Sequence, residues 1–422
     1  MKEFKGEWFL ANNQEIKIPG ILTIDDEHFK ISLQLFSTHE ISPQFNGQLV
    51  LGLCALQKIT IVNCYARSEE QIPFDFFISD YAPHFVFVGC HFNSLEELNF
   101  KSISLRFNYL NHWLEEKRVS SLKLEHQGDD SVVVKYFSRN DITIKLNKDC
   151  NLVFQRSCST NGVYGTELHL KVKHYATFVL EEHRSFKEFL NLTVKLQNIL
   201  MLCIGKPLSI LERIGFSEKA IDLNETNFLK LEQNPIAIYQ HSEIENIAKN
   251  DFIHFSKFLI SFARSSAQEI ESLIIKWFEE YEKFEPVYDI FFHAIKPIWR
   301  GDSFTMSNVT YNNAFLNIVQ ALESYHRIKF KKKATLENRI KELLKNKKIF
   351  AFLFNNELDI AKNLVKWRDS LTHINHQKST DIEVINWFNK AQIILIVNLF
   401  KDLGIDEEKI KQTISSSRLF PK

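Results

Sequence analysis

The sequence predicts an α+β protein in which an N-terminal antiparallel β-domain is followed by a C-terminal all-α helical bundle. From about residue 7 to residue 179, short runs rich in Ile, Val, Phe and Thr alternate with polar positions, and this period of two indicates strands. Beyond residue 241, apolar residues recur at intervals of three and four, which indicates helices. The 422 residues, 45% of them hydrophobic, are enough chain for more than one buried core.

The β-domain is expected to span residues 1–180. A hairpin is predicted where residues 20–24 and 29–35 flank the polar loop 25–28, because loops of three to five residues commonly join paired strands. Further strands are expected at residues 47–51, 59–64, 84–88, 131–137, 142–146 and 168–172. Strands at this spacing fit an antiparallel sandwich or barrel.

The period changes near Ser185, where the first helix is expected to begin. Residues 206–240 contain Pro207 and Pro235 and have no sustained period, so the joint between the two halves is placed there. The sequence therefore predicts a connecting helical and irregular region at residues 181–240 and a helical region at residues 241–422.

Several helix ends in the C-terminal region have recognisable signals. Ser266 and Glu269 have the form of a capping box, in which each side chain accepts a hydrogen bond from the other residue's N–H. Pro286 and Pro297 are expected to bracket a shorter helix. Helices are then expected around residues 315–322, 336–344 and 358–365, and a last one from about residue 381 to 403, ended by Gly404 as a left-handed cap.

Composition excludes several classes of protein. Lys plus Arg and Asp plus Glu are both 52, so attraction to nucleic acid must come from a local patch. The six cysteines contain no Cys-x-x-Cys pair, which favours a reduced cytosolic interior. The N-terminus lacks the apolar core of a signal peptide, and the most apolar stretch, Ile393–Phe400, is too short to cross a bilayer, so neither export nor a membrane is expected. Phosphate-loop, G-x-S-x-G and H-E-x-x-H patterns are absent.

Arg368 and His373 are the candidate catalytic pair. Residues five apart on a regular helix point roughly 140° away from each other, so the two side chains are expected to converge only if Arg368 precedes a helix. Asp369 or Ser370 would then be the N-cap, and the free N–H groups of the first turn would face a phosphate. An imidazole can exchange protons with a ribose hydroxyl, and a guanidinium can hold the phosphoryl transition state, so this chemistry requires no metal and no other cofactor.

Two other interpretations of these residues remain open. Arg368 and His373 are also compatible with an ordinary helix end, as a surface Arg and a capping or partly buried His. Asp369, His373 and His376 have the spacing of metal ligands on one helix, but no further ligand is evident, so no metal site is expected.

A basic zone lies between residues 321 and 348, where ten basic and three acidic residues give a net charge of +7. Such a zone would attract RNA phosphates and make binding dependent on salt. A solvated loop and helix face is the alternative interpretation. The residues expected to contact RNA are Lys331, Lys332, Lys333, Lys347 and Lys348.

Two parts of the sequence resemble a known family. The segment RDSLTH at residues 368–373, in a C-terminal helical bundle, resembles the R-x4-6-H motif of HEPN ribonucleases, and ALESYH at residues 321–326 is similar to an upstream helix of the ApeA-like HEPN group. GEWFL, IPGIL and FKISL, which begin at residues 6, 18 and 29, resemble the opening of the ApeA N-terminal domain. Together the resemblances cover most of the chain and place a HEPN core at about residues 305–415.

The resemblance implies a metal-independent HEPN endoribonuclease of bacterial anti-phage defence, of the abortive-infection type. It implies that Arg368 stabilises phosphoryl charge and that His373 acts as acid and base, with Asp369 and Glu323 as supporting polar residues. The implied partners are RNA, with transfer RNA among the candidates, a second copy of the chain paired through the HEPN domain, and a phage-derived or host trigger bound by the N-terminal domain. The implied location is the cytoplasm.

One departure from the family pattern favours a different class of function. The family often has Asn directly after the Arg, whereas this chain has Asp369, which puts a negative charge beside the expected phosphate. The alternative is a non-catalytic RNA-binding or dimerisation module, coupled to a β-domain that recognises a partner.

Overall fold

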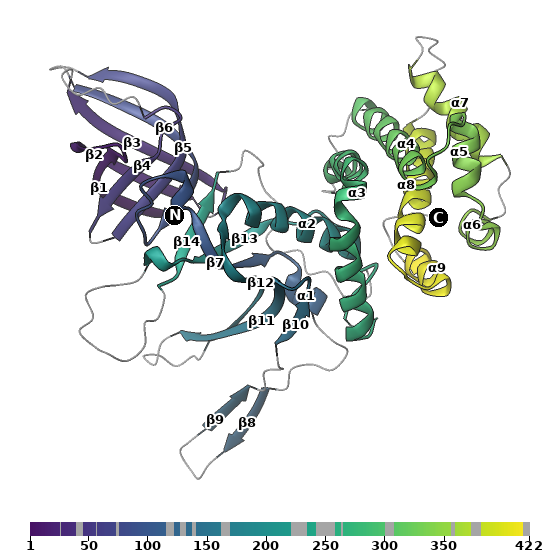
Figure 1. The fold of residues 1–422 in the computed structure, drawn as a ribbon, viewed down its shortest axis with the longest axis horizontal. Helices are drawn as coiled ribbons and strands as arrows, with labels where there is room; N and C mark the ends of the chain where they lie inside the picture. The colour runs from purple at the N-terminus through teal and green to yellow at the C-terminus, as the bar shows by residue number, and fades with distance from the viewer. Residues whose placement is uncertain are drawn as a thin grey trace. The chain divides into compact units, whose positions relative to one another are not determined.

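The computed structural model describes residues 1–25, 27–38, 45–55, 57–72, 76–114, 122–126, 132–136, 141–161, 169–220, 234–241, 258–262, 265–299, 308–355, 359–372 and 381–416. The chain forms two compact units, which we call the β unit and the helical unit (Figure 1). The β unit comprises Met1–Leu110, Ser120–Thr193 and Ser209–Asp251, and the helical unit comprises Asn111–Val119, Val194–Leu208 and Phe252–Lys422.

Within the described residues, twelve strands of the β unit pair into one sheet. They are β1 (Lys2–Leu10), β2 (Asn13–Asp25), β3 (Lys30–Thr38), β4 (Val50–Cys54), β5 (Gln57–Ile72), β6 (Phe76–Val88), β7 (Asn99–Phe107), β10 (Ile142–Lys145), β11 (Cys150–Asn161), β12 (His169–Ser185), β13 (Ile210–Phe216) and β14 (Ile236–Gln240). Their order is β10-β11-β12-β7-β13-β14-β6-β3-β2-β1-β4-β5. A separate hairpin joins β8 (Leu122–His126) to β9 (Val132–Tyr136). Neighbouring strands run antiparallel, which confirms the predicted class of β-domain.

The first six strands close into a barrel. β6 pairs with β5 over residues 76–88 and with β3 over residues 76–81, so the order β6-β3-β2-β1-β4-β5 returns to β6. Beyond β3, residues 85–88 of β6 pair with β14 instead. One strand therefore belongs both to the barrel and to the open sheet that β14 begins (Figure 1).

Trp8 fills the barrel interior and is fully buried. It lies directly opposite Gly52 in the pairing of β1 with β4. A Cβ atom at Gly52 would approach the Trp8 ring to 2.3 Å, and one at Gly20 would approach it to 2.9 Å. Gly52 is therefore required by the space that the indole occupies, because packed interiors tolerate very little overlap. At Gly20 the Gln34 carbonyl (2.5 Å) and the Leu35 side chain (2.7 Å) leave even less room than the indole.

The helices are α1 (Leu110–Leu114), α2 (Phe186–Ile204), α3 (Ala267–Trp299), α4 (Asn308–Phe330), α5 (Leu336–Leu343), α6 (Lys347–Leu353), α7 (Ile360–Thr372), α8 (Asp381–Asp402) and α9 (Glu407–Ser416), with short 3-10 turns at Leu95–Glu97 and Glu218–Ala220. Two predicted helix ends are confirmed. Glu269 N–H donates to Ser266 Oγ at 3.2 Å and Ser266 N–H donates to Glu269 Oε2 at 2.7 Å, as a capping box requires. Gly404 has φ +84° and ends α8, and Ile405 N–H donates to the Phe400 carbonyl at 2.9 Å.

The prediction that Pro286 and Pro297 bracket a short helix is wrong, because α3 runs through both. An interior proline costs a helix about 3 kcal/mol. Phe284, Val287 and Tyr288, on either side of Pro286, are all buried. Since burial of each such side chain contributes about 1.5–3 kcal/mol, packing outweighs the local break.

The sheet also extends beyond the expected boundary at residue 180. Residues 181–240, expected as a helical and irregular connection, contain α2 but also β13 and β14, which pair with β7 and β6. Polar residues inside β13 hide its alternation, so pairing with β7, about a hundred residues earlier, decides its conformation.

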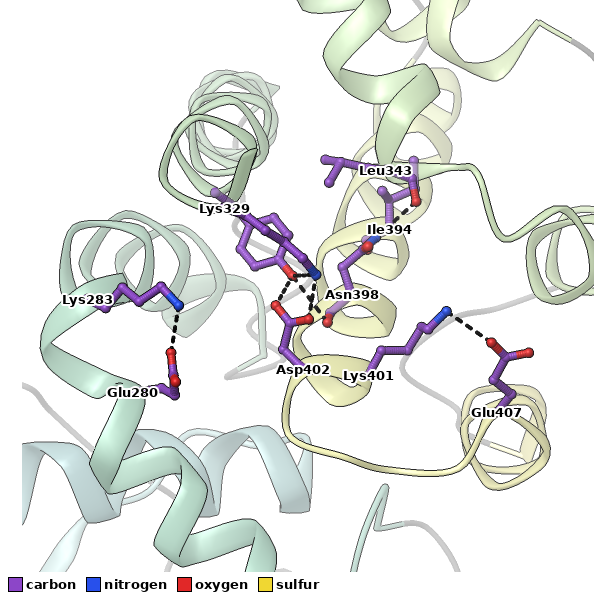
Figure 2. A network of polar contacts seen from close by, with 10 residues as sticks. Glu280, Lys283, Lys329, Leu343, Ile394, Asn398, Lys401, Asp402 and Glu407 are labelled. Carbon is purple, nitrogen blue, oxygen red and sulfur yellow. Dashed lines mark hydrogen bonds and ion pairs between the residues drawn. The ribbon is translucent and has the colours of Figure 1, made fainter. Parts of the chain in front are cut away.

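In the helical unit, a polar network joins the C-terminal turns of α4 and α8 (Figure 2). The buried Tyr325 hydroxyl donates to the Asp402 carboxylate. The backbone carbonyl oxygen of Asn398 lies 3.3 Å from the same hydroxyl. Lys329 Nζ donates to the Tyr325 hydroxyl at 3.0 Å and forms an ion pair with Asp402. Burial, with the Asp402 charge adding to it, raises the pKa of Tyr325, which keeps the phenol protonated as a donor.

No helix in the described ranges is long and apolar enough to cross a membrane. The predicted core stretch Ile393–Phe400 lies in α8, and its apolar side chains are buried. All six cysteines are free thiols, five of them buried. Burial raises the pKa of Cys54, Cys90 and Cys150 to about 11, so these thiols stay protonated at neutral pH.

Candidate active site

Arg368 lies on α7, whose buried face consists of Ile360, Ala361 and Leu364. These three side chains recur at one- and three-residue steps and therefore share one side of the helix. α7 contacts α4, α5 and α8. Packing of α7 thus fixes the backbone that carries Arg368.

The prediction that Arg368 precedes a helix start is wrong. Arg368, Asp369 and Ser370 are all helical residues near the C-terminal end of α7, so neither Asp369 nor Ser370 is an N-cap. Ser370 Oγ donates to the Trp367 carbonyl at 2.8 Å and Thr372 Oγ1 donates to the Arg368 carbonyl at 3.1 Å. The dipole at this end is negative, which favours a cation such as Arg368 but does not direct N–H groups at a phosphate.

The Arg368 guanidinium forms an ion pair with the next residue, since Nη1 lies 2.9 Å from Asp369 Oδ1. The two side chains are 42% and 46% exposed. Exposed pairs of this kind are worth about 0–1 kcal/mol, so the guanidinium can exchange Asp369 for another anion at little cost. The predicted partner His373 lies outside the described residues, as does His376 of the alternative metal site.

Glu323 is held by two arginines. Its Oε1 accepts from Arg339 Nη1 at 2.8 Å and from Arg327 Nη2 at 3.1 Å. Arg339 is nearly buried, and its Nε donates to the Ala334 carbonyl at 2.9 Å. Glu323 therefore fixes α4 against the start of α5, and its carboxylate is already neutralised.

Ion pairs within the basic zone reduce its free positive charge. Five of the ten basic side chains pair with its three acids, and Lys329 pairs with Asp402; the five are Arg327, Lys332, Arg339, Lys341 and Lys345. Lys331, Lys333 and Lys348 are exposed and form no ion pair with the described residues, whereas the Lys347 side chain lies outside them. Lys331 has φ +52° and ends α4 in the left-handed conformation. Among the described side chains of this zone, the exposed cations without an ion pair are thus Lys331, Lys333 and Lys348.

A buried His–Glu pair beside this zone was missed in the sequence. His326 is fully buried, and its Nε2 lies 2.7 Å from Glu342 Oε2, which joins α4 to α5. Glu342 also accepts from Lys345 at 2.9 Å and lies 3.4 Å from Lys332. No sequence pattern marks this pair, because the two residues belong to different helices.

Acid is expected to weaken the helical unit through Glu342. The hydrogen bond from His326, followed by that from Lys345, lowers the pKa of Glu342 from 4.5 to about 2. Its contribution to stability is therefore complete above pH 4.5 and is lost as the pH falls toward 2. Melting temperatures between pH 6 and pH 2 should fall more steeply for the wild-type protein than for Glu342→Gln, which has no carboxylate to protonate. Parallel curves would contradict this assignment.

No group of three or more His, Cys, Asp or Glu side chains that could hold a metal ion occurs within the part of the chain that the structure describes. The described residues therefore assign no metal centre, and of the predicted catalytic pair they include Arg368, on α7.

These observations define a class: a two-part protein with an antiparallel β-rich N-terminal unit and a C-terminal helical unit. Two family models match the chain, ApeA N-terminal domain 1 over residues 3–277 and Apea-like HEPN over residues 316–409. The chain belongs to the ApeA family and combines its N-terminal domain with its HEPN domain. No curated protein and no solved structure was found to match it. At the level of the family, this architecture supports a nuclease-type role in anti-phage defence.

Proposed function

We propose that this protein is a metal-independent endoribonuclease that acts in the bacterial cytoplasm as an abortive-infection defence against phage. The observation that carries the proposal is a half-exposed Arg368 on a packed helix, five residues before His373, inside the region that matches Apea-like HEPN. The Arg368 guanidinium is weakly held by Asp369, so a phosphate can replace that carboxylate.

In the proposed reaction, the ribose 2′-oxygen attacks the adjacent phosphorus. His373 accepts the 2′-hydroxyl proton, the P–O5′ bond breaks, and the O5′ leaving group takes a proton from an imidazole. The products are a 2′,3′-cyclic phosphate and a 5′-hydroxyl. Arg368 compensates the charge that develops on the phosphoryl oxygens through two parallel N–H donors.

A second copy of the chain is proposed to complete the site, because HEPN domains commonly dimerise and two copies would bring two Arg368 and two His373 side chains to one RNA. Lys331, Lys333 and Lys348 supply exposed cations for the RNA backbone, and Lys332 can join them if it leaves Glu342. RNA binding should then weaken with rising salt. The N-terminal domain is proposed to bind the trigger, and transfer RNA is one candidate target.

The test is cleavage of RNA by the purified protein in excess EDTA. We expect cleavage to persist, and we expect the new ends to be a cyclic phosphate and a 5′-hydroxyl, which phosphatase and kinase treatment of the fragments identifies. Loss of cleavage on chelation, or fragments with 5′-phosphates, would contradict the mechanism.

The alternative is a non-catalytic RNA-binding or dimerisation module, and the Arg368–Asp369 ion pair favours it because the guanidinium already has an anion. Salt-dependent RNA binding without cleavage of any RNA class, including transfer RNA from infected cells, would support this alternative.

A further inference from the structure

Arg213 is a buried cation in the β unit that forms no ion pair with any described carboxylate. It lies on β13, and its side chain is 6% exposed. The adjacent Glu212 has the opposite situation: it pairs with Arg106 at 2.9 Å and with Lys173 at 2.8 Å. Neighbouring residues of a strand point to opposite faces of the sheet, so the Glu212 carboxylate is not a counter-ion for Arg213.

One edge of the Arg213 guanidinium, formed by Nε and Nη2, is only partly hydrogen-bonded. Nη2 donates to Gln240 Oε1 at 3.1 Å, and the buried Nε has no hydrogen-bond partner. Nε–H and Nη2–H point in parallel along the same edge of the guanidinium, which is the geometry that accepts two oxygens of one oxyanion. In the structure, the acceptor on this edge is the uncharged amide oxygen of Gln240.

This arrangement costs stability. Burial lowers the pKa of Arg213 only to about 10, so the group is still charged at neutral pH. Among the described residues, its aromatic contact is with Phe85, whose ring centre lies 6.0 Å from the guanidinium carbon. A buried charge without a counter-ion is less favourable than an apolar side chain of similar size, so the fold alone does not account for an arginine here.

The side chain that covers this edge lies at the protein surface. Gln240 is exposed, and its Nε2 lies 3.5 Å from His84 Nε2, the long limit for a hydrogen bond. If Gln240 rotates, its amide oxygen leaves the guanidinium, while the amide N–H2 and the His84 ring stay nearby as further hydrogen-bonding groups. A tetrahedral anion has enough oxygens to use all of them, whereas a carboxylate has two.

We propose that the Nε–Nη2 edge of Arg213 binds a phosphate group, either free or carried on a small molecule, which replaces the Gln240 amide oxygen. The site belongs to the β unit and does not depend on the nuclease proposal. Two oxygens of the phosphate accept from Arg213, and a third accepts from Gln240 Nε2. The buried charge is thereby neutralised only when the ligand is bound.

The experiment measures the melting temperature of the full chain in phosphate and in chloride at equal ionic strength, with adenosine monophosphate as a second probe. We expect a saturable upward shift for the wild-type protein, because a ligand that binds only the folded state stabilises it. A larger shift with the nucleotide would identify a phosphate carried on a small molecule, and an equal or smaller one would identify the free ion.

Three variants separate this site from general effects of charge. Arg213→Met should raise the melting temperature in chloride and abolish the shift in phosphate, whereas a structural arginine would give a lower melting temperature. Gln240→Glu places a carboxylate beside Arg213. This variant should also melt at a higher temperature in chloride and show no shift in phosphate. Lys145→Met, which removes an exposed cation from β10, should keep the wild-type response. Equal phosphate shifts in the wild-type and Gln240→Glu proteins, or no shift in the wild type, would overturn the proposal.

Discussion

Replacing Arg368 by alanine is expected to lower RNA cleavage by roughly 10²–10³-fold, because removal of one charge-stabilising donor from a reaction of this kind typically costs that much. His373→Ala should lower it by roughly 10²–10⁴-fold, the range for loss of a general acid–base group. Arg368→Lys keeps the charge but loses the two parallel donors, so we expect only partial activity. The measurement is the rate of RNA cleavage under single-turnover conditions.

Two control variants on α7 make this prediction specific. Lys362 is an exposed cation of the same helix, and Lys362→Ala should retain most of the activity. Asp369→Asn removes the anion that lies 2.9 Å from Arg368 but keeps a polar side chain, so cleavage should be maintained or increased. Wild-type rates in Arg368→Ala, or equal losses in Arg368→Ala and Lys362→Ala, would show that Arg368 has no special role.

Gly52→Val is expected to destabilise the β unit by about 3 kcal/mol, near the upper end of the usual cost of overpacking a core. The Cβ atom would lie 2.3 Å from the Trp8 ring, and Trp8 cannot withdraw because it is fully buried inside the closed barrel. Denaturant unfolding, monitored by tryptophan fluorescence, gives the free energy of unfolding of each variant.

Two further variants test the cause of that loss. Leu53→Ala changes the next residue of β4, which is 42% exposed, and should alter stability by less than about 0.5 kcal/mol. The double variant Trp8→Leu/Gly52→Val should be more stable than the sum of its two single effects, since the smaller ring-free side chain leaves room for the added methyl groups. Strict additivity would mean that the two residues do not compete for the same space.

Local chemistry predicted some parts of this fold well. The capping box at Ser266 and the left-handed Gly404 depend on neighbours within a few residues, and both are where the sequence predicts them. β13 and the continuous α3 were not predicted, because their conformations depend on partners distant in the chain: β7 for β13, and α4 for α3, where the Tyr325 ring stacks on Phe284.

In the candidate site too, features set by nearby residues were predicted and features set by distant residues were not. Helical periodicity predicted the first part of α7, but Asp369 and Ser370 looked like the N-cap of a new helix and instead belong to the end of the same helix. The ion pair of Glu323 with Arg339 and the lack of a described counter-ion for Arg213 were not predicted from the sequence either. Each depends on side chains from other elements. Ion-pair partners across elements leave no periodic trace in a sequence.

Because β6 belongs both to the barrel and to the open sheet, one of its edges stays unpaired for part of the synthesis on the ribosome. Residues 85–88 pair on one side with β5, which is made earlier, but on the other side with residues 237–240, which emerge some 150 residues later. Until then, the nascent chain presents an unpaired strand edge that other chains can join. Chaperone protection during that interval should therefore matter more for soluble yield than the stability of the finished barrel.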